Sequence, residues 1–288
     1  PYGEEFDATD DGIVCPQFAI GAGEAMGDED CLNLNVYTPK VDKKKRAVLV
    51  YIHGGAFITG GGSSSTFGPA YLVENDVVVV TFNYRLGALG FLATEDKAST
   101  GNMGIKDQIL ALKWVQNNIA AFGGDPNKVT IFGEDAGAAS VSIHLMSPES
   151  NGEYFFTVTE YIMFKTKIRI LPEKFYLKNN VFLVIGLFHN AITMGGNALC
   201  DQFFQTNPQE SAVELASRLD CTSEKGEDIV NCLSRQTQQD ITQKTSEMFV
   251  SVYYLHMIGN LKSSLKISVS FIAIIVNFKY SSDFNLCF

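Results

Sequence analysis

The pattern of apolar and polar positions predicts strands and helices in a regular order. Residues 33–38 (NLNVYT) alternate as a half-buried strand does, and residues 47–52 (AVLVYI) form a denser apolar run. Residues 77–82 (VVVVTF) are β-branched on both faces, as in a central strand of a parallel sheet. From residue 103 to residue 122, apolar side chains recur every three or four positions, which predicts a helix that ends at Gly123.

A further strand and helix follow directly. Residues 129–132 predict a short strand, and residues 136–145 predict a helix that begins immediately after it. Residues 187–194 again have the texture of a strand. Strands and helices in this order imply an α/β fold with a doubly wound, mostly parallel sheet.

Composition limits the classes of function. The chain has 288 residues, of which 46% are hydrophobic, so it can bury the large core of an α/β domain. Its formal net charge of -10 argues against nucleic acid as a partner, because binding to phosphates requires clustered Lys and Arg. No metal-type Cys/His spacing is present, and we expect neither a metal nor another cofactor.

The cysteines bear on the cellular compartment. By spacing they divide into two close pairs, Cys15 with Cys31 and Cys221 with Cys232, and two without an obvious mate, Cys200 and Cys287. Two short closed loops suit an oxidising compartment, and buried free thiols in a cytosolic enzyme are the alternative. The chain begins at Pro1, and we expect its true N-terminus, with any signal peptide, to lie upstream.

The segment with the most chemical information is VTIFGEDAGAASV, residues 129–141. A predicted strand runs into Gly133, Asp135 and Gly137 and then into a predicted helix, which is the pattern of a nucleophile elbow. Upstream, HGGAF (residues 53–57) follows another predicted strand. Its glycines would let backbone amides approach a developing oxyanion, and a plain glycine turn after a strand is the alternative.

Several motifs together resemble the type-B carboxylesterase and cholinesterase family, whose members have the α/β-hydrolase fold. The resemblance covers residues 1–152 and 186–249. The motifs, in chain order, are EDCLNLNVYTP (29–39), YIHGGAF (51–57), NYRLGALGFL (83–92), GNMGIKDQ (101–108), FGGDPNKVTIFGE (122–134) and GLFHNAITMGG (186–196).

The resemblance implies hydrolysis of carboxylic esters through an acyl-enzyme. It places the oxyanion donors at the amides of Gly55, Ala56 and Ala136, with Ala56 standing where the family usually has glycine. It also implies two disulfides, Cys15–Cys31 and Cys221–Cys232, each worth about 3 kcal/mol in the chain-entropy account.

The chain departs from the family at the nucleophile. Asp135 stands where the family has serine, and the family's catalytic acid and histidine lie downstream of the region that this chain matches. None of the four histidines, His53, His144, His189 and His256, stands at the position of the family's general base. We therefore expect a partial α/β-hydrolase, its C-terminal part missing, that does not hydrolyse esters.

The Asp135 carboxylate suggests a more specific hypothesis. It lies where the oxyanion amides point, so it could occupy their site itself. Two alternatives stay open. One is a non-catalytic, cholinesterase-like adhesion or binding protein. The other is a hydrolase with an aspartate nucleophile, which would form an ester intermediate and need a histidine to resolve it.

The sequences of two segments do not resemble the family. Residues 153–185 and 250–288 are rich in Phe, Tyr, Ile and Lys, and their edges can be encoded as splice sites, so we hypothesise that both are translated introns. Residues 186–249 would continue the hydrolase domain begun by residues 1–152. The apolar run 267–278 is shorter than the about 20 residues needed to span a bilayer, so we expect no membrane span. We expect a secreted protein, and the sequence indicates neither its particular ester nor its oligomeric state.

Overall fold

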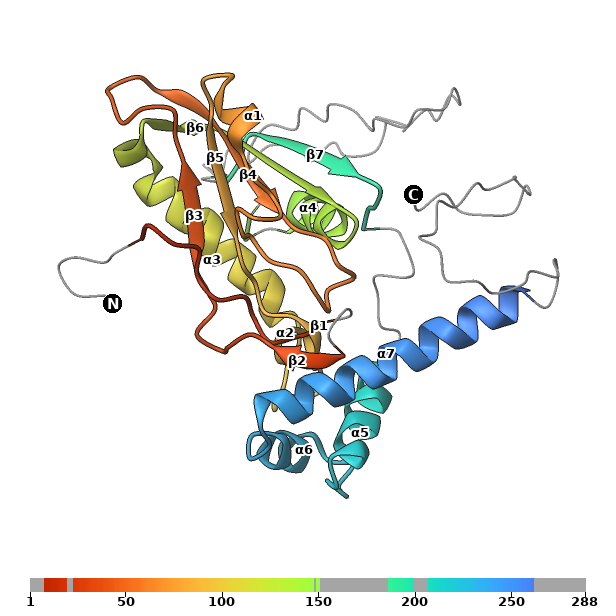
Figure 1. Cartoon of the computed structure of the whole chain (residues 1–288). Coiled ribbons are helices and arrows are strands. Elements are labelled where there is room, and N and C mark those ends of the chain that lie inside the picture. The colour runs from red at the N-terminus through yellow and green to blue at the C-terminus, as the bar shows by residue number, and fades with distance from the viewer. Residues whose placement is uncertain (1–7, 20–22, 148, 151–185, 199–206, 262–288) are drawn as a thin grey trace, which may run out of the picture.

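A five-stranded sheet forms the centre of the molecule in the computed structural model, with strand order β3-β5-β4-β6-β7 (Figure 1). The structure describes residues 8–19, 23–147, 149–150, 186–198 and 207–261, the last twelve of them by backbone alone. The strands are β3 (Leu34–Tyr37), β4 (Arg46–Ile52), β5 (Val78–Phe82), β6 (Gly124–Glu134) and β7 (Asn190–Met194).

The sheet is mixed but mostly parallel. Strand β3 pairs antiparallel with β5, whereas the pairs β4–β5, β4–β6 and β6–β7 are parallel. From β4 the chain moves to β5 on one side and then crosses over to β6 on the other. In such sheets the switch in direction leaves a crevice at the carboxyl ends of the two strands concerned, here β4 and β6. The predicted fold class is confirmed, and the topology itself indicates where to look for a site.

Two long helices complete the main core. Helix α3 (Met103–Asn118) continues as a 3₁₀ turn, η1 (Ile119–Phe122), and helix α4 (Ala136–Met146) follows β6 after one intervening residue. Apolar side chains of α3 and α4 pack with those of the sheet in a single cluster, in which Val48 and Val50 of β4 and Val78 and Val80 of β5 are fully buried. The predicted helix 103–122 is therefore correct in extent, although its last turn tightens.

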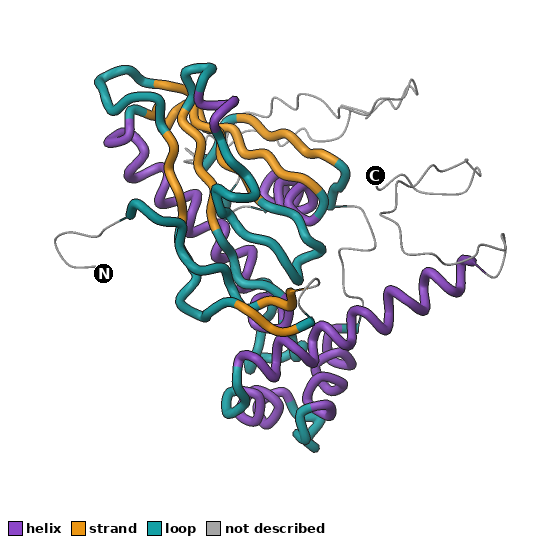
Figure 2. Tube along the Cα trace, viewed as in Figure 1, coloured by secondary structure: helices purple, strands orange, loops and turns teal. Residues whose placement is uncertain are grey.

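A smaller helical layer lies beside one end of the sheet (Figure 2). It consists of α5 (Pro208–Arg218), α6 (Gly226–Leu233) and α7 (Gln238–Leu261), which share a second apolar cluster with residues of α2 (Gly87–Phe91). The disulfide Cys221–Cys232 closes the connection from α5 to α6. The remaining elements are the hairpin of β1 (Gln17–Ala19) and β2 (Glu24–Met26), and α1 (Ala70–Val73).

The segments predicted to be discordant lie largely outside the described residues. This holds for 153–185, for 262–288 including the apolar run 267–278, and for Cys200 and Cys287. Helix α7 runs through the predicted boundary between residues 249 and 250 without interruption. None of the described helices is long and apolar enough to cross a membrane.

Candidate active site

The predicted elbow lies at the carboxyl ends of the adjacent parallel strands β4 and β6. Asp135 lies between β6 and α4 with φ 55° and ψ -121°, a backbone conformation that costs a non-glycine residue about 1–3 kcal/mol. The two flanking glycines are sterically required. A Cβ on Gly133 would lie 2.5 Å from the carbonyl carbon of Gly137, and a Cβ on Gly137 would lie 2.0 Å from the carbonyl oxygen of Ile52. The turn from strand to helix is therefore as sharp as the motif predicted.

The loop after β4 meets Asp135 directly. The amides of Gly55 and Ala56 each donate a hydrogen bond of 2.9 Å to Oδ2 of Asp135. The amide of Ala136 is the third predicted donor. Within the described part of the chain, no hydrogen bond joins it to this carboxylate. The structure thus brings together three of the four predicted site residues through hydrogen bonds and places the fourth next to Asp135 along the chain.

The loop owes its shape to three consecutive residues with positive φ: Gly55 at 111°, Ala56 at 53° and Phe57 at 61°. This conformation turns successive amides toward one point, which lets two of them bind the same oxygen. Glycine is required at position 55, because a Cβ there would lie 2.1 Å from the carbonyl oxygen of Thr59. Ala56 carries the strain of a left-handed conformation that glycine would adopt without cost.

Buried amide side chains fix the far end of this loop. Gln17 accepts hydrogen bonds from the Gly60 amide at 2.8 Å and from Thr59 Oγ1 at 2.7 Å, and its Nε2 donates to the Gly60 carbonyl at 2.7 Å. Asn83 accepts from the Gly62 amide at 2.8 Å. Gln17 does not stand out in the sequence, and Asn83 does so only as the first residue of the motif 83–92. The role of both side chains in holding the loop depends on contacts with residues more than twenty positions away.

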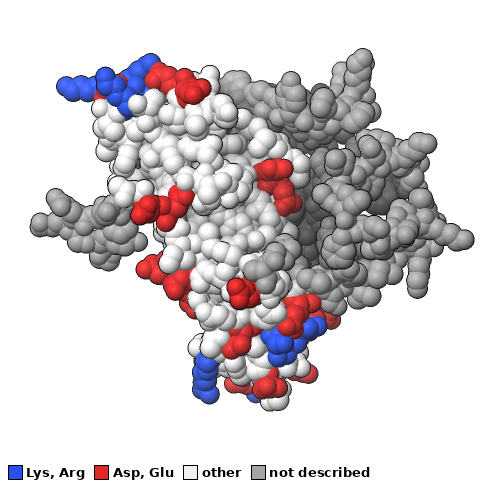
Figure 3. All heavy atoms as spheres, in the orientation of Figure 1, with Lys and Arg blue, Asp and Glu red and all other residues white. Residues whose placement is uncertain are grey.

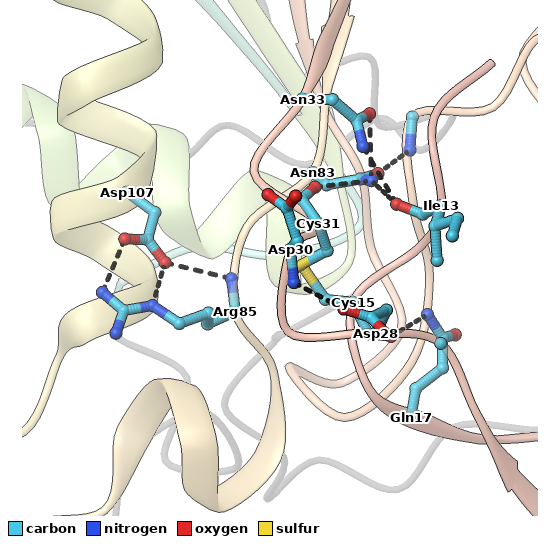
Figure 4. The surroundings of a disulfide bond; sticks show 12 residues. Ile13, Cys15, Gln17, Asp28, Asp30, Cys31, Asn33, Asn83, Arg85 and Asp107 are labelled. Atoms are coloured by element: carbon cyan, nitrogen blue, oxygen red, sulfur yellow. Dashed lines mark hydrogen bonds and ion pairs between the residues drawn. A yellow bond between two sulfur atoms is a disulfide. The ribbon is translucent and has the colours of Figure 1, made fainter. Parts of the chain in front are cut away.

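The disulfide Cys15–Cys31 is joined to Gln17 and Asn83, the two side chains that hold this loop (Figure 4). Asn83 Nδ2 donates to the Cys31 carbonyl at 3.0 Å and to the Ile13 carbonyl at 2.9 Å, so it joins the disulfide loop to the segment after β5. Gln17 Nε2 also donates to the Cys15 carbonyl at 3.1 Å. Both predicted disulfides are thus present, and the first one supports the loop that contacts Asp135.

A chain of buried polar groups lies beneath the elbow. His144 Nε2 and Gln108 Oε1 are 2.8 Å apart, and Gln108 Nε2 donates to Ser140 Oγ at 3.0 Å. Ser140 in turn donates to the carbonyl of Ala136 at 2.9 Å. At the other end, His144 Nδ1 lies 3.1 Å from Ser150 Oγ. These bonds join α3 to the first turn of α4, and so they hold the helix that follows Asp135.

The histidines whose side chains are described do not bond Asp135. Burial lowers the pKa of His53 to about 4, and its Nδ1 lies 2.8 Å from the Gly54 carbonyl while its ring stacks on Tyr84. Burial likewise lowers the pKa of His144 to about 4. His189 Nδ1 accepts from the amide of Val129. The described polar contacts of these three histidines are thus with groups other than Asp135, and the side chain of His256 lies outside the described residues.

The surroundings of Asp135 are aromatic and negatively charged. Burial raises the pKa of Tyr51 to about 12, and the charges of Glu134 and Asp135 add to this effect. Burial also raises the pKa of Tyr84, again with a contribution from Asp135.

Within the described part of the chain, Asp135 forms no ion pair. In the same part of the chain, no cluster of three or more His, Cys, Asp or Glu could hold a metal ion. The face shown in Figure 3 carries scattered acidic groups, with basic groups gathered at its two ends.

Comparison with known proteins agrees with this architecture. The sequence matches the model of the carboxylesterase family over residues 1–161 and 182–271. Esterase E4 of Myzus persicae is 39% identical over 250 residues, which are 84% of this chain and 39% of that protein. Juvenile hormone esterase of Tribolium castaneum is 49% identical over 155 residues, which are 53% of this chain and 26% of that protein.

Solved structures give the same result. The crystal structure of juvenile hormone esterase from Manduca sexta, with OTFP covalently attached, superposes with a TM-score of 0.67 and 31% identity over 90% of this chain and 43% of that one. The chain therefore spans about two fifths of the length of the first relatives and structures that it matches. The match to the family model covers most of the sequence, and the elbow, the preceding loop and the sheet have the expected arrangement: this chain belongs to the carboxylesterase family.

Proposed function

We propose that this chain is a catalytically silent member of the carboxylesterase family, in which Asp135 closes the acyl-transfer site from within. Two features support this. An aspartate occupies the elbow, and its Oδ2 accepts the amides of Gly55 and Ala56. These amides are the donors that a substrate's carbonyl oxygen would need when it becomes negative. Members of the family hydrolyse esters through an acyl-enzyme on the serine of the elbow. This chain has Asp135 in place of that serine, and its two oxyanion amides already have an acceptor.

The energetics favour the closed state. A hydrogen bond to a charged group is worth about 1.5–3 kcal/mol, so two amides hold the carboxylate with several kcal/mol relative to unpaired groups. A neutral ester carbonyl is a weaker acceptor and would have to displace an ionised oxygen that is covalently attached at the site. Loss of the nucleophile of a triad costs on the order of a millionfold in turnover. We therefore expect this chain to hydrolyse esters no faster than they hydrolyse in buffer without protein.

Turnover of p-nitrophenyl acetate tests this proposal. The purified chain and the variant Asp135→Ala should both release p-nitrophenolate at the rate of a protein with no active site. As a matched control, Glu134→Ala removes a neighbouring carboxylate that does not contact the oxyanion amides, and it should behave identically. Turnover by the parent that Asp135→Ala abolishes would contradict the proposal, because Asp135 would then be a working nucleophile.

Occupation of the oxyanion site has its own test. In Asp135→Ala the amides of Gly55 and Ala56 lose their acceptor, and acetate can take its place. Acetate should therefore raise the melting temperature of Asp135→Ala more than that of the parent, because a ligand that binds only the folded state stabilises it. Equal effects of acetate on both proteins would show that Oδ2 does not occupy the site in solution.

We propose further that residues 153–185 and 250–288 are translated introns. The match to the family model is interrupted at 162–181, inside the first segment, which supports this for that segment; the match extends to residue 271, so it gives no such support for residues 250–271. The sequence of the mature transcript tests this directly, and a message that retains both segments would contradict it.

The cellular location is also a proposal. The two disulfides favour the secretory pathway or the exterior, where disulfides persist. A full-length gene product with an upstream signal peptide, recovered from the medium of expressing cells, would support this location. Retention of the protein in the cytosol with reduced thiols would contradict it.

A further inference from the structure

Strand β7 forms one edge of the sheet (Figure 1). It pairs with β6 over five consecutive residues without a bulge, and no second strand pairs with it among the described residues. The amide of Asp135 donates to the carbonyl of Met194, so the backbone of Met194 faces β6. Because the direction of the backbone groups alternates along a strand, those of Ala191 and Thr193 point away from the sheet. The outer side of β7 therefore presents donors and acceptors that no described strand takes up.

This edge lacks the features that usually keep edge strands from pairing, which are charged side chains, prolines and bulges. The sequence of β7, NAITM, contains neither a charge nor a proline. Ile192 and Met194 are 37% and 38% exposed, although both are large and apolar. At the opposite edge, by contrast, all four residues of β3 are half-buried. Of the two edges, β7 is therefore the one that offers both backbone groups and exposed apolar side chains to a partner.

We propose that β7 pairs antiparallel with β7 of a second copy of this chain, so that the two sheets join into one across a two-fold axis. An uncharged strand is compatible with its own copy, because no like charges come to lie opposite each other. The two-fold symmetry makes each hydrogen bond between the strands occur twice. This pairing does not depend on whether the site at Asp135 is silent.

The directions of the backbone groups indicate a register. With the axis at Ile192, this residue lies opposite its own copy, and Asn190 lies opposite Met194 of the second copy. The backbone of Ile192 faces β6, as that of Met194 does, so the central pair is of the non-hydrogen-bonded type, in which side chains approach closely. Ala191 and Thr193 then exchange hydrogen bonds on both sides of the axis.

The described charges permit this arrangement. Glu134 lies on β6 opposite Met194 and is exposed. Its two copies would be separated by three strand spacings across the sheet and four residues along it, which is roughly 20 Å. That separation exceeds the Debye length of about 8 Å at physiological salt, so their repulsion is screened. The net charge of -10 still makes two whole chains repel, so added salt should strengthen the association.

Sedimentation equilibrium of the full chain tests the pairing. The mean mass should rise from one chain toward two with increasing concentration, and added salt should shift this rise to lower concentration. Ile192→Lys should abolish the rise, because two ammonium groups would meet at the axis. Leu110→Lys is the matched control, since Leu110 is a 60% exposed apolar residue of α3 rather than of β7. Its replacement should leave the association unchanged.

A mixture of two charge variants tests the position of the axis. Ile192→Lys and Ile192→Glu should each remain monomeric alone, because like charges meet. Mixed in equal amounts, they should form heterodimers, because opposite charges then lie across the axis.

Cross-linking gives a measurement that introduces no charge. In the non-hydrogen-bonded pair the two Cα atoms at position 192 would lie about 4.5 Å apart, which is within the range of a disulfide. Mild oxidation of Ile192→Cys should therefore link two chains, and peptide mapping should place the link at position 192. Thr193→Cys is the matched control. Its copy is offset by two residues along the strand, so it should not link to itself, and the parent controls for its own cysteines.

Three results would overturn the pairing. The first is a parent chain that stays monomeric at every concentration, as it would if another segment of the same chain covered β7. The second is association that persists in Ile192→Lys, and the third is equal cross-linking at positions 192 and 193, since both would assign the contact to another surface. If Ile192→Lys fails to fold, the cross-linking of Ile192→Cys decides. None of these measurements involves ester turnover, so this inference and the proposed function can fail separately.

Discussion

Replacement of Ala56 by glycine should stabilise the protein, although it removes a methyl group. Ala56 is exposed and has φ 53°, so the methyl group contributes little burial while the backbone bears left-handed strain. That conformation costs an L-residue about 1–2 kcal/mol, and glycine avoids the cost. Glycine loses about 0.4–1 kcal/mol more chain entropy on folding, so the net gain should be about 0.5–1 kcal/mol.

The same substitution at Ala120 is the matched control. Ala120 is also exposed, but it lies in the right-handed 3₁₀ turn η1, where alanine is favoured over glycine. Ala120→Gly should therefore destabilise by about 0.5–1 kcal/mol. Urea denaturation at constant m-value measures both changes, and their opposite signs are the expected result. Equal destabilisation by both variants would refute a left-handed conformation at residue 56, and with it the geometry that turns two amides toward Oδ2.

Further predictions concern the elbow, a disulfide and pH. Asp135→Ala, which leaves two donors without an acceptor, should destabilise by about 1–3 kcal/mol in a urea titration, and Asp135→Asn by less. Gly137→Ala should cost about 3 kcal/mol and broaden or lower the melting transition, because the new Cβ overlaps a carbonyl of β4. Replacement of Cys221 and Cys232 by alanine should lower the free energy of unfolding by about 3 kcal/mol, and an unchanged value would show that the disulfide is absent in solution. Burial lowers the pKa of His144 to about 4 in the folded chain. As the pH falls below about 6.5, His144 is therefore protonated in the unfolded chain but still neutral in the folded one. His144 should then contribute on the order of 3 kcal/mol to the decline in stability between pH 6.5 and pH 4, beside a similar contribution from the buried His53, and the decline should be smaller in His144→Gln.

The shape of the elbow depends both on the local sequence and on contacts with residues that are distant in the chain. Gly133 and Gly137 are recognisable from sequence because the sharp turn excludes larger residues at fixed offsets from Asp135. The conformation of Asp135, however, is strained, and a strained residue persists only when the surrounding structure over-determines it. The buried chain from His144 through Gln108 to Ser140 supplies part of that structure. It joins side chains more than thirty positions apart, which no local pattern reveals.

The sequence by itself indicated the five strands of the central sheet, the helices α3 and α4, the family and the two disulfide pairs, but not the helical layer of α5, α6 and α7. These follow from periodicity and from motifs whose residues are close together in the chain, where the required spacing is visible directly. The match of β4, β5, α3 and α4 to their predicted positions reflects this locality, whereas β6 (Gly124–Glu134) is longer than the predicted strand 129–132.

The resemblance suggested that Asp135 could occupy the oxyanion site, but only the tertiary structure decided which amides it contacts. Its partners Gly55 and Ala56 lie about eighty positions away, and they meet it because β4 and β6 are adjacent parallel strands whose carboxyl ends lie together. The same is true of Gln17 and Asn83, which hold the loop in the required shape. Hydrogen bonds are short-ranged and directional, so their partners are fixed by the packing of the whole sheet rather than by the residues near them in sequence.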